Sequence, residues 1–205
     1  MTRLLAVRSA LTFGIALLAC SSFVEAQDTP FYFVHPSFNS SSIEKIHLLR
    51  GVDLSFETKG HKGFDGRLSG RVLNSLKKSG HYDAEFDKTA SIVDVTLGNL
   101  SKLSPEWIRT IGPAAARWVM LFVIVDSAAG KKVLAKATCE MDLYLFDRVE
   151  GTVLYRNRVV QSFADSLIMP SKVSATNAMV YAIEQLQEAF PRKGENPRPP
   201  AAAKE

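Results

Sequence analysis

The sequence predicts an α+β domain in which an antiparallel or mixed sheet of about five strands carries two helices on one face. Three observations predict this fold. Apolar and polar residues alternate over positions 133–145, which indicates a strand with one buried face. Apolar residues recur at helical spacing in two segments, 65–79 and 171–190. Residues 119–125 are apolar at every position, as expected of a central strand that is covered on both faces.

The elements are expected in the order β-α-β-β-β-β-α. The apolar residues of the first strand share one parity: Ile46, Leu48, Val52, Leu54 and Phe56. A Gly-rich loop at 60–66 leads into a helix over about 65–79, which ends at Gly80 because glycine favours helix C-termini. A second strand is expected from five further apolar residues: Ile92, Val93, Val95, Leu97 and Leu100.

Three more strands and a helix complete the domain. The strands at 119–125 and 133–145 are joined by a hairpin turn at 126–130, and a second turn at 147–151 leads to a strand over 152–163. Ser171 can cap the final helix, whose apolar face carries Val173, Met179, Ile183, Leu186 and Phe190. Both helices are expected on the same face of the sheet, because two packed layers then enclose one core.

The 205 residues are consistent with one domain, at residues 43–190, flanked by segments of different composition. Residues 1–19 are typical of an export signal, with Arg3 and Arg8 before an apolar stretch too short to span a membrane. Residues 27–42 are rich in Pro, Asn and Ser and predict an exposed tether, some of whose aromatic residues pack on the domain. Residues 191–205 contain four prolines and predict a disordered tail.

Two sites compete for cleavage of the signal. Residues 17–20, Leu-Leu-Ala-Cys, resemble a bacterial lipobox, which would make Cys20 the lipidated N-terminus and a membrane tether. Alternatively, Ala26 ends a small-x-small pattern for the ordinary signal peptidase, which would remove residues 1–26 and discard Cys20. Either route predicts an exported protein of the periplasm, anchored to the outer membrane if Cys20 is lipidated. Cys139, the other thiol, is expected to be a buried small hydrophobe.

The charge of the mature protein is small. The formal net charge is +4, but the signal holds two of the 25 basic residues and none of the 21 acidic ones, so its removal leaves +2. No basic block is longer than two residues, so nucleic acid is not an expected partner.

No residue is nominated as catalytic, cofactor-binding or metal-ligating. The four histidines, at 35, 47, 61 and 81, lack metal-ligand spacing, and there is no Gly-x-Ser-x-Gly nucleophile motif. The loop at 60–66 lacks a phosphate-binding signature, and Asp94 is expected to face solvent. A hydrolase is therefore the least favoured function, and the sequence predicts a protein that is not an enzyme.

Two features are candidates for binding a partner. The irregular segment 104–117 carries Trp107, Ile108 and Ile111, which could anchor a protein partner or instead fold back over the sheet. Arg156 and Arg158 share one face of a strand, where they could meet an anionic partner or simply be solvated.

These patterns resemble the small envelope α+β domains of Gram-negative bacteria found in the curli-secretion lipoprotein, the penicillin-binding-protein activator lipoprotein and the N-terminal domain of TolB. The resemblance covers about residues 43–190 and is carried by five segments: 46–49, 73–82, 90–94, 125–130 and 145–147. It implies an accessory protein in envelope assembly or transport. We expect such a protein to bind another envelope protein through a sheet edge or the Trp107 segment, and self-association is a further expected contact. The alternative is a lipid- or lipopolysaccharide-binding assembly factor that uses Arg156 and Arg158.

Overall fold

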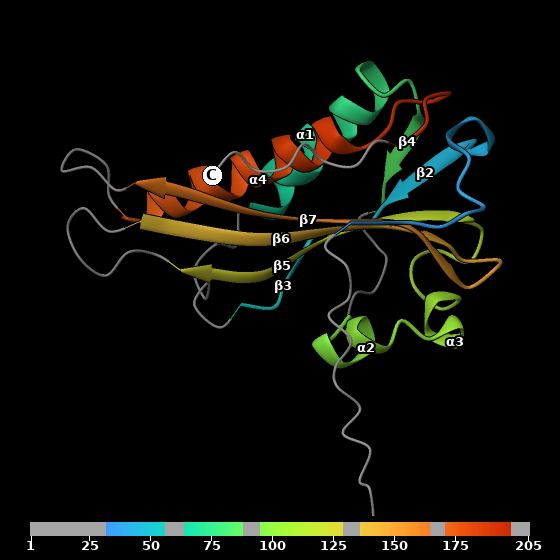
Figure 1. Ribbon diagram of the computed structural model, residues 1–205, viewed down its shortest axis with the longest axis horizontal. Coiled ribbons are helices and arrows are strands. Elements are labelled where there is room, and N and C mark those ends of the chain that lie inside the picture. The colour runs from blue at the N-terminus through green and yellow to red at the C-terminus, as the bar shows by residue number, and fades with distance from the viewer. Residues whose placement is uncertain (1–31, 56–63, 88–94, 129–135, 165–170, 198–205) are drawn as a thin grey trace, which may run out of the picture.

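The computed structural model describes residues 32–55, 64–87, 95–128, 136–164 and 171–197. Within them, seven strands form one mixed sheet in the order β1-β7-β6-β5-β2-β4, and β3 also pairs with β5 (Figure 1). The strands are β1 (Tyr32–Val34), β2 (Lys45–Leu48), β3 (Val52–Asp53), β4 (Asp83–Phe86), β5 (Trp118–Ala128), β6 (Lys136–Asp147) and β7 (Thr152–Ala164). The helices are α1 (Phe64–Lys78), α2 (Leu97–Lys102), α3 (Pro105–Ile108) and α4 (Ser171–Ala189), with a short 3-10 helix, η1 (Ser40–Ser42). The predicted α+β class is confirmed, with seven strands instead of about five.

The centre of the sheet is an antiparallel meander of β5, β6 and β7. In β5, Val119, Leu121 and Val123 are buried on one face, and Met120 and Phe122 are buried on the other. The continuous apolar run of this strand follows from its position, because a strand covered on both sides has no face that favours polar residues.

The first predicted strand is divided into two. β2 and β3 both pair in parallel with β5, and residues 49–51 interrupt them. Leu48 packs with the core on one face of the sheet, whereas Leu49 and Val52 pack with the core on the other. The shared parity of these apolar residues therefore did not mean a shared face, because the interruption shifts the alternation by one residue.

The second predicted strand is wrong for the part that the structure describes. Leu97 and Leu100 lie in α2, whose first turn is capped by the Thr96 hydroxyl, which accepts a hydrogen bond from Asn99 N at 3.2 Å. The strand that follows α1 is instead β4, which runs parallel to β2. β4 was missed because it is short and, of its four residues, only Ala84 is buried.

Helices cover both faces of the sheet. Figure 1 shows α1 and α4 on one face, called here the α1–α4 face, and α2 and α3 on the opposite α2–α3 face. The predicted packing of two helices on one face holds for the long helices, which contact each other and share a core with β5 and β6. A second core lies under the short helices, where Leu100 and Ile108 pack with Val119 and Leu121.

The described residues of both flanking segments pack on the domain. β1, inside the expected tether, pairs antiparallel with β7 at Tyr155–Asn157. Residues 191–197, inside the expected disordered tail, are held by hydrogen bonds from Tyr82 Oη to Pro191 O at 3.0 Å and from Lys193 N to Gly80 O at 2.9 Å. The two segments also meet, because Ser40 Oγ donates to Glu195 O at 2.7 Å.

Several expectations concern residues that the structure does not describe: the signal at 1–19, Cys20, the Gly-rich loop before α1 with His61, Asp94, and the tip of the first hairpin. Among the described helices, none is long and apolar enough to cross a membrane. Cys139 is described, and it is fully buried on the α1–α4 face as predicted. Burial raises the pKa of its thiol to about 12.

Candidate functional site

Arg156 and Arg158 bind one buried carboxylate. In the β6–β7 ladder, Arg158 lies opposite Asp142, and Arg156 lies opposite Tyr144. Asp142 is 1% exposed, and it accepts hydrogen bonds from Arg156 Nη2 at 2.9 Å, Arg158 Nη2 at 2.9 Å and Tyr144 Oη at 2.8 Å. Arg158 also forms an ion pair with Glu140 at 2.6 Å. The two arginines and two carboxylates thus make a neutral cluster within the α2–α3 face.

The charge of Asp142 is stabilised within this cluster. Burial raises the pKa of its carboxyl group, but the hydrogen bond from Arg158 and the charge of Arg156 outweigh burial, so the pKa lies below its ordinary value. The Arg156 side chain is only 6% exposed, and its guanidinium lies 5.1 Å from the centre of the Tyr144 ring. Arg156 is therefore an internal structural group, neither a solvated residue nor a free cationic site as the sequence had suggested.

The Trp107 segment folds back over the sheet. Ser104 caps α3 by accepting a hydrogen bond from Trp107 N at 3.3 Å, and Ile108 and Ile111 are buried in the core of the α2–α3 face. Trp107 is half-buried, with its ring edge-on to Phe146 at 6.0 Å. The hypothesis that Ile108 and Ile111 are exposed anchors is therefore wrong. The segment instead folds back over the sheet, which was the alternative.

The β6–β7 hairpin holds the Trp107 segment through hydrogen bonds. Arg148 donates to the carbonyl oxygens of Pro113, of Ala116 at 3.0 Å and of Arg109 at 2.7 Å. In the opposite direction, Arg109 donates to a hairpin carbonyl, Glu150 O, at 3.1 Å. Burial lowers the pKa of Arg148. Hydrogen bonds in both directions make the segment a fixed part of the fold.

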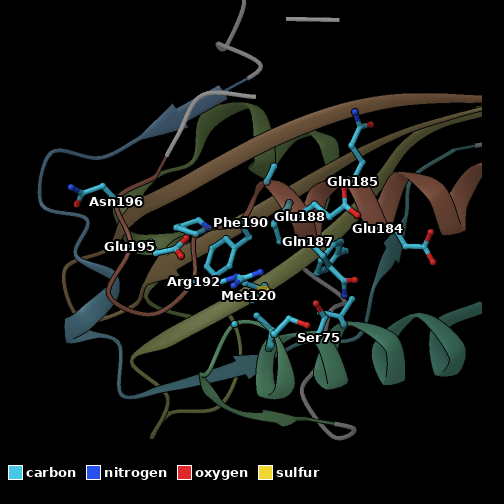
Figure 2. A pocket seen from close by; sticks show the side chains of 18 residues that line it. Ser75, Met120, Glu184, Gln185, Gln187, Glu188, Phe190, Arg192, Glu195 and Asn196 are labelled. Atoms are coloured by element: carbon cyan, nitrogen blue, oxygen red, sulfur yellow. The ribbon is translucent and has the colours of Figure 1, made fainter. Parts of the chain in front are cut away.

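A groove between α1 and α4 is the feature that sequence reasoning missed (Figure 2). Its volume is about 830 Å³, within the range typical of ligand sites. The floor is apolar and combines helix and sheet residues: Val72, Leu76, Met120, Phe122, Leu143 and Phe190. The rim is polar: Ser75, Ser79, Glu184, Gln187, Glu188, Arg192, Glu195 and Asn196. An apolar side chain could enter such a groove while its polar neighbours stay at the rim.

The walls of the groove are held at both ends. At one end, Arg71 of α1 forms an ion pair with Glu184 of α4 at 2.6 Å. At the other end, the chain after α4 turns across the mouth, and the ring of Phe190 lies edge-on to Tyr155 at 5.1 Å and tilted to Tyr82 at 5.7 Å. These contacts link α1 to α4 at one end of the groove and hold the turn after α4 at the other end. Sequence patterns carry little signal of the groove, because its closing turn lies in the predicted disordered tail.

The described residues of the groove carry groups suited to binding. No group of three or more His, Cys, Asp or Glu side chains in the part of the chain that the structure describes could hold a metal ion. On the α2–α3 face, the best-buried charged side chains are those of Asp142 and Arg156, and they form an ion pair with each other. The groove instead offers apolar surface, amides, hydroxyls and carboxylates.

Comparisons with known proteins show structural similarity only. No protein family matches the sequence, and no curated protein is significantly similar to it. Lipoprotein GNA1162 from Neisseria meningitidis is 12% identical, with a TM-score of 0.45 over 72% of this chain and 99% of that one. The PelC dodecamer from Paraburkholderia phytofirmans, as an L103M variant, is 14% identical, with a TM-score of 0.42 over 74% and 95% of the two chains. The protein CT253 from Chlamydia trachomatis is 13% identical, with a TM-score of 0.40 over 71% and 91%.

Proposed function

We propose that this protein is a non-enzymatic accessory module of the cell envelope that binds a segment of another envelope protein in the groove between α1 and α4. The observation that carries the proposal is the groove, with its apolar floor and polar rim. Burial of apolar side chains supplies most of the affinity in such sites, and the polar rim orients the bound segment.

The net charge of the groove rim favours one chemical class of partner. Three carboxylates line the groove, those of Glu184, Glu188 and Glu195, against the single guanidinium of Arg192. Arg71 pairs with Glu184 from outside the lining and neutralises one of the three. The remaining excess is negative, so the favoured partner is a peptide segment with apolar side chains flanked by lysine or arginine.

The lipid-binding alternative has less support. In that alternative Arg156 and Arg158 bind anionic head groups, but in the structure both arginines bind the Asp142 carboxylate. The acidic rim of the groove would also repel an anionic head group at its mouth. Lipid binding is therefore tested as the binding of an acyl chain on the apolar floor of the groove.

Export remains part of the proposal and depends on the N-terminal sequence. Arg3 and Arg8 precede an apolar stretch that ends at Ala19, as in export signals. Lipidation of Cys20 would place the domain at a membrane surface, and cleavage after Ala26 would release it into the periplasm.

The groove is tested by site-specific photocrosslinking in cells. A photoreactive phenylalanine analogue replaces Ser75, which lines the groove, or in the control Asn74, an exposed neighbour on α1 outside the lining. We expect the probe at Ser75 to capture a protein through a segment rich in apolar and basic residues, and the probe at Asn74 to capture far less. Equal capture at both positions contradicts the proposal, and lipid adducts confined to Ser75 favour the lipid alternative.

Filling the groove provides an independent test. Ser75→Trp places a large side chain over the floor, whereas Asn74→Trp places the same side chain on the outer surface of the helix. Partner capture by the tagged, processed protein is expected to fall at least tenfold for Ser75→Trp only. If both variants capture the partner as the wild type does, the groove is not the binding site.

A further inference from the structure

In the part of the chain that the structure describes, the outer edge of β7 is unpaired over half of its length. β7 spans Thr152–Ala164, but its pairing with β1 covers only Tyr155–Asn157. Within the described residues, no strand pairs with the outer edge from Val159 onward. The register with β6 is regular from Tyr155 to Ala164, so this part of the edge is straight and free of bulges.

The hydrogen-bonding direction of the edge can be read from β1. His35 N donates to Leu154 O at 2.8 Å, which places Leu154 and Arg156 among the β7 residues whose backbone groups face outward. Regular alternation along the strand extends this to Val160 and Ser162. Gln161 directs its own backbone groups inward, toward β6.

The open edge lacks the features by which proteins block unwanted pairing. Residues 159–163 are Val, Val, Gln, Ser and Phe, without the charges or proline that commonly protect an edge strand. Val160 is 62% exposed. On the α1–α4 face the edge is flanked by α4, where Gln185 hydrogen-bonds Gln161 and Tyr181, one turn away, is 50% exposed.

We propose that this edge binds a second copy of the chain, in an antiparallel β7–β7 pair related by a two-fold axis at Gln161. In that register Val160 of one copy lies opposite Ser162 of the other, and each such pair exchanges two backbone hydrogen bonds. The outward-facing groups of both copies therefore meet in register. This interface is separate from the groove and goes beyond the proposed function.

The side chains of the edge suit a two-fold pair. The uncharged stretch puts no like charges opposite each other across the axis, and it offers no net charge by which to select a foreign strand. The two Val160 side chains become diagonal neighbours on the α2–α3 face, where each loses much of its exposure. Because the same patch serves both copies, the contact closes as a dimer and does not propagate.

Disulfide trapping tests the register. At the axis, the two Gln161 residues form a non-hydrogen-bonded pair with Cα atoms about 4.5 Å apart, which a disulfide can span. In the processed protein carrying Cys20→Ala, Gln161→Cys is expected to give a disulfide-linked dimer on mild oxidation. The control is Val149→Cys in the β6–β7 hairpin, where Val149 is 61% exposed, and it is expected to give no disulfide-linked dimer. Cys139 is buried and does not interfere.

Sedimentation or light scattering of the processed protein tests the dimer itself. We expect a dimer for the wild type and for Val149→Lys, and monomers for Val160→Lys and Ser162→Pro. Ser162→Pro removes an outward N–H and leaves the β6 ladder intact. Unchanged circular dichroism spectra establish that the monomeric variants are folded. A wild-type monomer up to about 100 μM, where an interface of μM affinity would be occupied, overturns the proposal, as does a dimer that survives both edge substitutions.

Discussion

Asp142→Asn is the substitution that should most affect the stability of the fold. Asp142 is 1% exposed and joins three side chains: Tyr144, Arg156 and Arg158. An asparagine of nearly the same size keeps one acceptor oxygen but removes the negative charge. Arg156 would then be buried beside a neutral group, because its side chain is only 6% exposed.

The expected cost follows from that burial. Removing one partner of a buried ion pair typically destabilises a protein by about 3–5 kcal/mol, since the other charge is left uncompensated. Removing both charges leaves neither of the two charges uncompensated, although Tyr144 Oη loses its acceptor in Asp142→Leu and in the double substitution alike. Asp142→Leu combined with Arg156→Met is therefore expected to cost less than the sum of the two single substitutions. Arg158 retains Glu140 at 2.6 Å in both cases, which makes Arg156 the dominant unpaired charge.

Urea unfolding followed by circular dichroism measures these differences without screening the charges. The result that would refute the reasoning is a loss below about 1 kcal/mol for Asp142→Asn, the size expected of a solvated surface pair. A double substitution that costs the full sum of the single ones would likewise show that the two side chains do not interact.

The same cluster predicts a pH dependence. Its arginine partners hold the pKa of Asp142 below its ordinary value of about 3.9, so the unfolded state binds this proton more tightly than the folded state does. The stabilisation is therefore complete above about pH 4 and is lost as the pH falls through the folded-state pKa. The difference in unfolding free energy between wild type and Asp142→Asn should be constant from about pH 5 to 8 and shrink below pH 4.

Three further predictions concern single positions. Gly151→Ala should destabilise the fold by more than about 1–2 kcal/mol in urea unfolding, since Gly151 has φ +69° and a Cβ there would lie 2.8 Å from Pro105 O; Gly70→Ala, with open space around it on α1, should not. Cys139, whose pKa is raised to about 12 by burial, should react with thiol reagents only after unfolding, and rapid labelling of the native protein would contradict its placement. Cys20→Ala should release the protein from the membrane fraction, unless sequencing finds a mature N-terminus downstream of Cys20.

The sequence predicted the long elements well, because an error of one residue at either end leaves most of their periodic pattern intact. β5, β6, β7 and α4 each extend over 11 residues or more, and their periodicity is set by a single buried face or by complete burial. β3 and α2 have two and six residues, too few for periodicity to distinguish a strand from a helix. The helix that begins at Leu97 is capped by Thr96 through one hydrogen bond, and the spacing of apolar residues carries no information about that bond.

The candidate sites were harder to predict because each depends on contacts between distant segments. Trp107 and Ile108 occupy a segment whose irregular sequence is compatible with an exposed loop. The burial of Ile108 and the Arg148 hydrogen bonds to the carbonyls of the segment show that it is a fixed part of the fold. The groove is closed by residues 190–196, whose composition suggests disorder. Their order comes from Tyr82 and Ser40, more than a hundred residues earlier in the chain.

The Asp142 cluster is different, because the sequence predicted both of its strands and left only their register open. Once the turn at 147–151 is accepted as a hairpin, antiparallel pairing assigns every β6 residue a partner in β7, to within the one-residue shift at Leu145. With the one-residue shift between Leu145 and Phe146, Asp142 falls opposite Arg158. Uninterrupted pairing from Asp147 and Thr152 would place Asp142 opposite Asn157, on the other face from both arginines. Two arginines across from an aspartate within a central antiparallel pair predict an internal ion pair, because opposite charges on neighbouring strands stabilise a sheet and a buried carboxylate requires a partner. The observed register therefore assigns these arginines to the interior, and the one-residue shift that sets this register is a local irregularity that apolar alternation does not reveal.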